Sequence, residues 1–548
     1  MIEQNFIKIY ENSFSKYWAQ PALTDYKDQT SYTYGELAKE IAKIHLMFEE
    51  LGIKKGDKVA LVGKNHSTWS MVFLATFTYG AVIVPVLHEF NSESMLHIIE
   101  HSDSKCAFIN DNIWNTLPHD KVKVPSFSIP SFELHQSSDN SHKQIKERVE
   151  EKFATKYPNG FSQSDIVYAD VSNEEVVCIN YTSGTTGFSK GVMLTANNYA
   201  GNITYAHTLG LLYPGERGLA FLPMAHAYGC AFDFLYALST GVHVTLLDVI
   251  PSPQNLVKAF QEIKPNIIIT VPLIFEKIYK KKILPVIQKP AIKFLLKIPG
   301  INNIIYKGIK KSLVESLGGN FREVIIGGAA LGKDIEAFFY RIKFPFTVGY
   351  GMTECAPLIS YDHHYDFIPT SCGSVLKGIM EARIDSSDPE KVPGEIQVRG
   401  ENVMAGYYKN PEATKETFTE DGWLKTGDSG ILVNNRLFIK GRIKTMLLGA
   451  NGQNIYPEEI EAKLNNLPYI SESLVVQRNN RLIALVYPDY AALKDDDISE
   501  QAIDAIMESN RTILNTTIAR YERINDIEIS KEEFEKTPKK SIKRFLYS

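Results

Sequence analysis

The chain has 548 residues, of which 44% are hydrophobic and 22% are charged, with 59 Lys+Arg against 64 Asp+Glu and a net charge of -5. This composition is typical of a globular protein with a large core, and the length allows several domains. The slightly acidic balance argues against a nucleic-acid partner.

The cysteines and the first residues bear on location. The five cysteines are scattered without a CxxC pair or a nearby His cluster, so we expect a reducing compartment and no structural zinc. Residues 1–14 carry Glu3 and Glu11 within an apolar pattern, unlike a secretory signal. We therefore expect a cytoplasmic protein.

The first half of the chain alternates helical and strand patterns. Residues 33–51 have helical spacing, with Thr33 and Glu36 placed for a capping box. The apolar run 71–87 is interrupted by Gly80 and Pro85, which favours a buried helix followed by a strand over a membrane span. Short β-branched runs predict strands at 58–62, 82–86, 242–247 and 267–271.

These patterns predict an α/β fold with two subdomains built on mainly parallel, helix-covered sheets. Past Gly373, short strands at 394–400 and 437–441 predict a small β-rich subdomain. A helix start follows at 457–461, with acids in its first turn. We place a domain boundary near Arg442, which gives an N-terminal domain of residues 1–441 and a smaller α+β domain of residues 442–548.

A loop rich in glycine and hydroxyl groups follows the strand predicted at 176–181. It reads Thr182, Ser183, Gly184, Thr185, Thr186, Gly187, Phe188, Ser189, Lys190, Gly191. Its N–H and O–H groups can surround phosphate oxygens. Lys190 lies three residues beyond Gly187, so the spacing is not that of a Walker A loop. A solvated surface loop is the alternative, but it does not account for the terminal Lys-Gly or for the preceding strand.

This loop resembles the signature of the acyl-adenylate-forming superfamily, which includes acyl-CoA synthetases, luciferases and peptide-synthetase adenylation domains. Ser189 stands where proline is usual, which loosens the turn but keeps the donors. The resemblance implies ATP, Mg²⁺ and, as co-substrate, coenzyme A. It also implies that the C-terminal domain is mobile.

Further motifs occur in the order found in that superfamily. The resemblance implies that Gly328, Ala329 and Ala330 form a wall beside adenine and that Tyr350 and Gly351 lie near the base. It also implies that Thr353 meets phosphate, that Glu354 and Thr182 hold Mg²⁺, and that Asp428 and Arg442 bind the ribose. Magnesium prefers such carboxylate and hydroxyl oxygens together with substrate phosphate.

The same resemblance implies a reaction in two halves. A carboxylate attacks the α-phosphate of ATP, aided by Lys190 and Glu354, and a thiol then displaces AMP. Lys444 is the expected hinge for rotation of the C-terminal domain, and Gly449 and Gly452 are expected to contact coenzyme A. Gly452 could equally be a plain turn residue.

The C-terminal catalytic lysine of the superfamily aligns with Ser541 in this chain. An extended segment would place Lys539, Ser541 and Lys543 on one face, so our hypothesis is that Lys543 supports adenylation. Lys540 could take this role instead if the loop bulges. The alternative is a solvated basic tail.

The sequence says less about which carboxylic acid is the substrate. His226, Tyr228 and Gly328 match the acyl-substrate region of the superfamily, and residues 271–279 resemble long-chain fatty acid ligases. Residues 277–311 contain ten lysines and no acid among apolar residues, which indicates peripheral contact with the inner face of a membrane or, equally, a solvated helical face.

The leading hypothesis is therefore a ligase that joins a medium- to long-chain fatty acid to coenzyme A, acting as a monomer or homodimer. Delivery of the acyl group to an acyl carrier protein and nucleotide binding without turnover are the alternatives.

Overall fold

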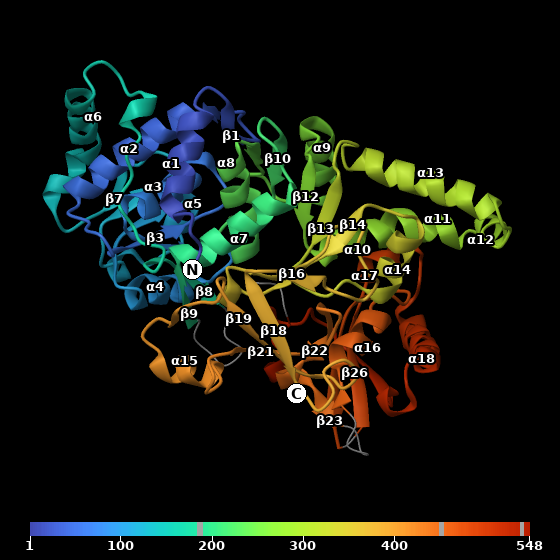
Figure 1. Cartoon of the computed structure of the whole chain (residues 1–548). Coiled ribbons are helices and arrows are strands. Elements are labelled where there is room, and N and C mark those ends of the chain that lie inside the picture. Colours follow the sequence, from blue (N-terminus) through green and yellow to red (C-terminus); the bar gives the residue numbers. More distant parts are fainter. Residues whose placement is uncertain (183–189, 449–453, 480, 538–541, 548) are drawn as a thin grey trace.

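The computed structural model describes residues 1–182, 190–448, 454–479, 481–537 and 542–547. In these ranges four sheets and their covering helices build the larger N-terminal body, and two small sheets with three α-helices build the C-terminal unit (Figure 1). The fold is thus α/β with a smaller α+β unit after it, as the alternation of patterns predicted.

An eight-stranded sheet carries one side of the functional region. Strands β8, β4, β3, β5 and β6 are parallel in that order, while β7, β9 and β20 pair antiparallel with their neighbours. The strands are β3 (Lys58–Val62), β4 (Val82–Val86), β5 (Ser104–Ile109), β6 (Ser126–Ser128), β7 (Leu134–Gln136), β8 (Val176–Thr182), β9 (Lys190–Thr195) and β20 (Gly406–Tyr407). Helices α2 (Tyr34–Glu50), α3 (Ser67–Tyr79), α4 (Ser92–His101) and α6 (Ile145–Lys156) accompany this sheet.

Two smaller, mainly parallel sheets lie beside it. One has the order β10-β11-β1-β2, with β10 (Arg217–Ala220), β11 (His243–Leu246), β1 (Pro21–Asp25) and β2 (Ser31–Thr33). The other has the order β12-β13-β14, with β12 (Ile267–Thr270), β13 (Glu323–Ile326) and β14 (Phe346–Val348). Their helices are α1 (Phe6–Lys16), α7 (Ala196–Leu209), α8 (Ala237–Thr240), α9 (Pro253–Ile263), α10 (Pro272–Ile278), α14 (Lys333–Arg341) and the π-helix η4 (Gly229–Tyr236).

A seven-stranded antiparallel sheet follows along the chain. Its order is β15-β16-β17-β22-β21-β19-β18, with β15 (Tyr350–Gly351), β16 (Leu358–Tyr361), β17 (Ser374–Val375), β18 (Met380–Asp385), β19 (Gly394–Gly400), β21 (Leu424–Val433) and β22 (Arg436–Arg442). This β-rich part therefore begins at Tyr350 and not after Gly373. Strands of two and four residues are too short to show the period-2 pattern by which a strand is predicted.

The C-terminal unit has its own hydrophobic core, which runs from Ile455 to Ile524 and is separate from the core of the body. Its strands are β23 (Leu447–Leu448), β24 (Asn454–Ile455), β25 (Ile470–Arg478), β26 (Arg481–Pro488) and β27 (Asp526–Ile529), with helices α16 (Pro457–Leu464), α17 (Tyr490–Asp495) and α18 (Glu500–Thr517). The short helix η7 (Ile443–Thr445) joins it to β22.

Polar contacts dock the C-terminal unit on the body. The hydroxyl groups of Ser429 and Tyr456 lie 2.8 Å apart, and Lys333 Nζ lies 3.0 Å from Glu459 Oε1. Lys280 donates to the backbone carbonyl of Asn465. These contacts join residues that precede η7 to residues that follow it, and they hold the unit against the body.

Several expected elements are confirmed. Helix α2 begins after Thr33 with the capping box to Glu36, and β19 has the expected bounds. The apolar run at 71–87 is a buried helix, α3, followed by β4. Within the described ranges, no helix combines the length and apolar character needed to cross a lipid bilayer.

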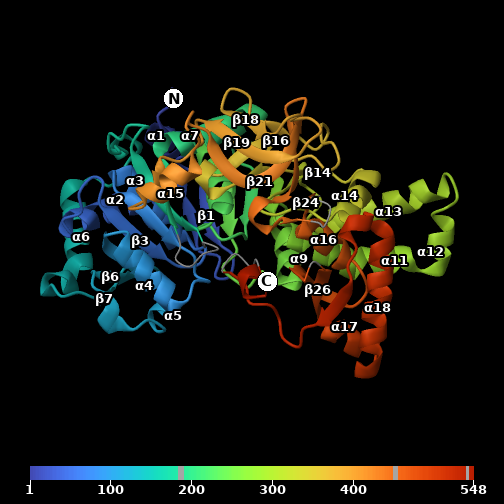
Figure 2. The same ribbon diagram turned by 90° about the horizontal axis from the view of Figure 1, so that it is seen from below.

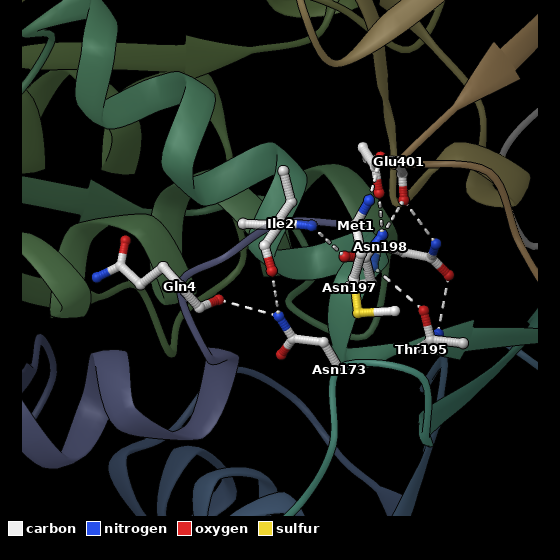
Figure 3. A network of polar contacts seen from close by, with 8 residues as sticks. All are labelled: Met1, Ile2, Gln4, Asn173, Thr195, Asn197, Asn198 and Glu401. Atoms are coloured by element: carbon white, nitrogen blue, oxygen red, sulfur yellow. Dashed lines mark hydrogen bonds and ion pairs between the residues drawn. The ribbon is translucent and has the colours of Figure 1, made fainter.

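A network of asparagine side chains fixes the segment that leads into β20. Asn198, near the start of α7, donates to the carbonyl oxygens of Glu401 and Val403 at 2.8 Å each. Asn197 and the Met1 amine contact the Glu401 carboxylate, as Figure 3 shows. One turn further along α7, the buried Asn202 donates to Cys355 O and accepts from Leu358 N–H. Helix α7 therefore holds the chain just after Glu354 and just before Tyr407.

Candidate active site

A cleft of about 2410 Å³ opens between the body and the C-terminal unit. Single-ligand pockets are typically about 300 to 1,000 Å³, so this volume can hold more than one small molecule. Many residues singled out from the sequence line it: Thr182, Lys190, His226, Tyr228, Gly328, Ala329, Ala330, Tyr350, Gly351, Thr353, Glu354, Asp428, Arg442, Lys444 and Lys543.

The two ends of the glycine-rich loop reach this cleft from the eight-stranded sheet. Thr182 ends β8 and Lys190 begins β9, and the two are paired across the antiparallel ladder. Both side chains are half-buried and line the cleft. Ser183, Gly184, Thr185, Thr186 and Gly187 lie outside the described residues, so their expected phosphate contacts stay predictions.

Tyr407 connects Lys190 with Glu354. Lys190 Nζ lies 4.7 Å from the centroid of the Tyr407 ring, and the Tyr407 hydroxyl donates to Glu354 Oε1 at 2.9 Å. Burial and the Glu354 carboxylate raise the pKa of Tyr407, so its hydroxyl keeps its proton. The structure thus brings together two motifs that are 164 positions apart in the sequence.

The backbone around Tyr407 explains this placement. Met404 N–H donates to Glu354 O at 2.8 Å, Ala405 N–H donates to Met193 O at 3.0 Å, and Tyr408 N–H donates to Gly191 O at 2.8 Å. Residues 404–408 are therefore bonded to the backbone of Glu354 on one side and to β9 on the other.

A second polar group forms around Asp428. The Tyr350 hydroxyl donates to Asp428 Oδ2 at 2.6 Å, and Arg442 Nε lies 3.1 Å from Asp428 Oδ1. Burial raises the pKa of Asp428, while the charge of Arg442 and the Tyr350 hydrogen bond oppose the shift. Asp428 and Arg442 are also register partners of β21 and β22, so the sheet itself places them opposite each other.

Small residues form one wall of the cleft. Gly328, Ala329 and Ala330 are exposed to it, and a side chain at the neighbouring Gly327 would meet the Tyr228 ring at 3.0 Å. The Tyr228 hydroxyl donates to Ile325 O at 3.1 Å, which fixes the ring against this wall. The half-buried His226 lies one turn before η4 and also lines the cleft.

A further set of lining side chains is apolar. They come from α7, α9, η4 and β12, from the ends of β10, β11 and β13, and from the adjoining loops. These elements are neighbours: α7 contacts η4, and α9 contacts β10. Strand β12 contacts β10, β13 and η4. The set comprises Leu209, Leu211, Leu212, Phe221, Phe232, Tyr236, Leu247, Val249, Leu256, Val257, Phe260, Ile267, Ile269, Leu317 and Ile325. Phe234, which follows the His226 motif, is a core residue that packs on Trp69 and Phe73.

The C-terminal unit contributes the opposite wall. Lys444 lies in η7, and Lys543 lines the cleft near the end of the described chain, where its Nζ lies 3.1 Å from Glu535 Oε2. Arg544 beside it pairs with the buried Glu461. Gly449, Gly452, Lys539, Lys540 and Ser541 lie outside the described residues, so the expected coenzyme A contacts and the alternatives to Lys543 are not described.

Tyr407 and the asparagines of α7 were missed by sequence reasoning. Tyr407 is one of 28 tyrosines and stands in a two-residue strand, where neither spacing nor residue type sets it apart. The Gly406-Tyr407 pair before Tyr408 is only a weak local signal. Asn202 occurs within a helix, and its contacts become visible only in the folded chain.

The acidic groups fit a magnesium ion bound together with phosphates. The described ranges hold no cluster of three or more His, Cys, Asp or Glu that could cage a metal. A magnesium ion that is held by one carboxylate and by substrate phosphates needs no such cluster. Glu354 is half-buried and lines the cleft, which is the donor that this arrangement requires.

The carboxyl group of Glu336 on α14 should make stability depend on pH. Burial raises its pKa from 4.5 to about 7, although Thr370 N–H donates to it at 2.6 Å. Between these values the folded state binds more protons than the unfolded state, so stability falls as pH rises through this window, by up to about 3 kcal/mol. Glu336→Gln should flatten this slope in urea unfolding at pH 5 to 7.5.

A matched control is Glu420→Gln, which changes an exposed carboxylate and should retain the wild-type slope. Equal slopes for the wild type and Glu336→Gln would contradict the assignment.

Comparison with known proteins accounts for nearly the whole chain. Residues 10–408 match the family described as AMP-binding enzyme, and residues 444–547 match the AMP-binding enzyme C-terminal domain. A long-chain-fatty-acid–CoA ligase of Mycobacterium bovis is 27% identical, with 94% of this chain and 90% of the relative covered. A chloroplastic long-chain-fatty-acid–[acyl-carrier-protein] ligase of Arabidopsis thaliana is 26% identical, with 91% and 78% covered.

The fold is also found among solved structures. O-succinylbenzoate coenzyme A synthetase of Bacillus subtilis, in complex with ATP and magnesium ion, has a TM-score of 0.74 at 18% identity, with 99% of each chain covered. Because the AMP-binding enzyme match alone spans well over half of the sequence and the motifs that resembled an acyl-adenylate-forming enzyme meet at one cleft, this chain belongs to the AMP-binding enzyme family.

Proposed function

We propose that this protein activates a medium- to long-chain fatty acid with ATP, releasing pyrophosphate, and transfers the acyl group to coenzyme A. The observation that carries the proposal is the convergence of Lys190, Glu354 and Asp428 on one cleft that also has an extensive apolar wall. Polar groups suited to a nucleotide and apolar groups suited to a hydrocarbon chain are thereby adjacent.

In this proposal the nucleotide lies along the polar part of the cleft. Asp428, held by Tyr350 and Arg442, accepts hydrogen bonds from the ribose hydroxyls, and the small wall at Gly328 to Ala330 faces the adenine. Thr182, Thr353 and the loop at 183–187 meet phosphate. Glu354 and Thr182 hold Mg²⁺, which neutralises phosphate charge when bound.

The chemistry needs positioning and charge neutralisation more than a side-chain nucleophile. An oxygen of the substrate carboxylate attacks the α-phosphorus, and the bond from that phosphorus to pyrophosphate breaks. Lys190, whose ammonium lies over the Tyr407 ring, stabilises the negative charge on the reacting phosphates. The thiol of coenzyme A then attacks the acyl carbon, the thiol proton is lost, and AMP leaves.

The choice of a fatty acid is supported by the apolar lining. A hydrocarbon chain gains about 0.8 kcal/mol for each methylene group that it buries, and the lining from α9, η4 and β12 offers such a surface. Tyr228 stands beside the small wall and His226 lines the cleft two residues before it, where the pair would meet the carboxylate end of the acid. The relative in Mycobacterium bovis bears the name of the same acid class.

The proposal includes two arrangements of the C-terminal unit, one for each half-reaction. Residues 1–441 form the adenylate-forming domain, and residues 442–548 rotate about Lys444 between the half-reactions. In the structure Lys543 faces the cleft, which suits the first half-reaction. Rotation would then present the face with Gly449 and Gly452 to the cleft for the second.

Delivery to an acyl carrier protein is the second candidate. One relative bears that activity in its name at 26% identity, close to the 27% of the coenzyme A ligase. Mass spectrometry of the products formed with coenzyme A or with holo-carrier protein separates the two acceptors.

A panel of acids tests the proposed reaction. Acetate, benzoate, octanoate and palmitate are supplied with ATP and Mg²⁺, and AMP is measured with and without coenzyme A. We expect AMP formation to rise with chain length because each added methylene is buried, and to need coenzyme A for turnover. A preference for acetate or benzoate, or no AMP with any acid, would refute the fatty-acid assignment.

Lys543→Ala should slow the first half-reaction alone. Lys543 faces the cleft in the arrangement described, so we expect pyrophosphate release to fall by about 10- to 100-fold while thioester formation from preformed adenylate is unchanged. Lys536→Ala is the matched control, because Lys536 Nζ lies 2.7 Å from Glu472 Oε2 in the C-terminal unit. Unchanged pyrophosphate release in Lys543→Ala would remove this lysine from the mechanism.

Tyr407→Phe should test the bridge between Lys190 and Glu354. The substitution keeps the ring below the ammonium but removes the donor to the carboxylate, so we expect adenylation to slow by about tenfold. Tyr408→Phe is the matched control, because the Tyr408 hydroxyl donates to Asp103 at 2.8 Å. The bridge has no role if both variants adenylate at the wild-type rate.

A further inference from the structure

A helical spur at residues 284–312 projects from the body. It comprises α11 (Leu284–Gln288), α12 (Pro290–Leu295) and most of α13 (Ile301–Ser316), and it extends away from all the sheets (Figures 1 and 2). The two ends of the spur pack on the core of the body through Leu284, Ile287, Tyr306 and Ile309. The tip between these ends reaches outward.

The spur is apolar in composition but is not buried. Thirteen of its residues are Leu, Ile, Val, Phe or Tyr, and the structure describes every residue from 284 to 312 without finding one that is buried. Phe294 is 66% exposed and Ile304 is 71% exposed. Exposed large apolar side chains gathered on one projecting element mark an interaction site.

The charge of this region is one-sided. Residues 277–311 carry ten lysines and no acidic residue, whereas the other residues carry 49 basic and 64 acidic side chains. Lys293 and Lys297 are exposed on either side of Phe294. On α13, Ile304, Lys307 and Lys311 stand at i, i+3 and i+7, which places them on one exposed helix face.

We propose that the tip of the spur docks on the surface of an anionic lipid bilayer. Phe294 and Ile304 enter the boundary between headgroups and acyl chains, while the lysine ammonium groups remain at the level of the lipid phosphates. A protein partner fits less well, because protein interfaces are depleted in lysine and enriched in arginine, and the segment has ten lysines and no arginine.

The root of the spur leads to the cleft. Helix α10 runs into the spur through the π-helical segment η5 (Tyr279–Ile283), and its residues Leu273, Ile274 and Ile278 line the cleft. A docked spur would therefore hold this apolar side of the cleft near the membrane, where a fatty acid dissolves. This link between docking and substrate supply rests on the proposed function, whereas docking itself does not.

Vesicle flotation of the full chain tests the docking. Phosphatidylcholine vesicles with about 30% phosphatidylserine should bind the protein at least about tenfold better than pure phosphatidylcholine vesicles at about 50 mM NaCl. Binding should weaken at about 300 mM NaCl, because salt screens the lysine charges. No preference for the anionic vesicles would overturn the proposal and would leave an acidic protein surface as the partner to test.

Paired variants separate the apolar and the charged contributions. We expect Phe294→Ser with Ile304→Ser to lower vesicle binding by about tenfold, and Val167→Ser with Tyr365→Ser to leave it unchanged, since the latter pair is equally exposed elsewhere. The charge variant changes Lys293, Lys297, Lys307 and Lys311 to Gln, and its control changes the exposed Lys54, Lys105, Lys121 and Lys391 to Gln. Equal binding by variant and control in either comparison would overturn the proposal.

A parallel assay keeps the two proposals distinguishable. The spur variants should turn over octanoate in solution at the wild-type rate, but should lose the advantage of palmitate presented in anionic vesicles. Vesicle binding without AMP formation from any acid would refute the proposed function and retain the docking. AMP formation without vesicle binding would do the reverse.

Discussion

The hydrogen bond from the Tyr407 hydroxyl to Glu354 is the contact on which the arrangement of the site depends. It joins the carboxylate of one motif to the aromatic ring that carries the Lys190 ammonium of another. Both charged groups are half-buried, so contacts within the protein help to set their positions relative to each other. The Tyr407 side chain thus contacts both charged groups, and all three residues line the cleft.

The pairing of backbone strands also determines where Tyr407 and Lys190 lie. Strand β20 pairs with β9 at the edge of the eight-stranded sheet, so Tyr407 lies next to Val192, two residues after Lys190. Asn198 and Asn202 of α7 bind the backbone just before Tyr407 and just after Glu354. Because buried amides left without partners cost free energy, these asparagines restrict the chain to one arrangement.

Much of the fold and part of the site could be predicted from local patterns. The cap at Thr33, the interrupted run at 71–87 and the alternation of strand and helix are local signals, and the structure agrees with them. Lys190 and Glu354 stand in motifs with distinctive neighbours. Tyr407 and Asn202 act through residues far away in sequence, so no short window contains their role. The basic C-terminal segment fits more than one register, and only Lys543 of its candidates lies in the described part of the chain.

The pairing of Asp428 with Arg442 has a consequence for movement. Arg442 is the last residue of β22 and is followed at once by η7, whereas Tyr350, the other partner of Asp428, lies within the body. Because the proposed hinge Lys444 follows Arg442, a rotation there would leave both the guanidinium and the phenol with the body. The pair would then keep the same geometry in both arrangements proposed for the C-terminal unit, so this part of the cleft would not have to be rebuilt between the half-reactions.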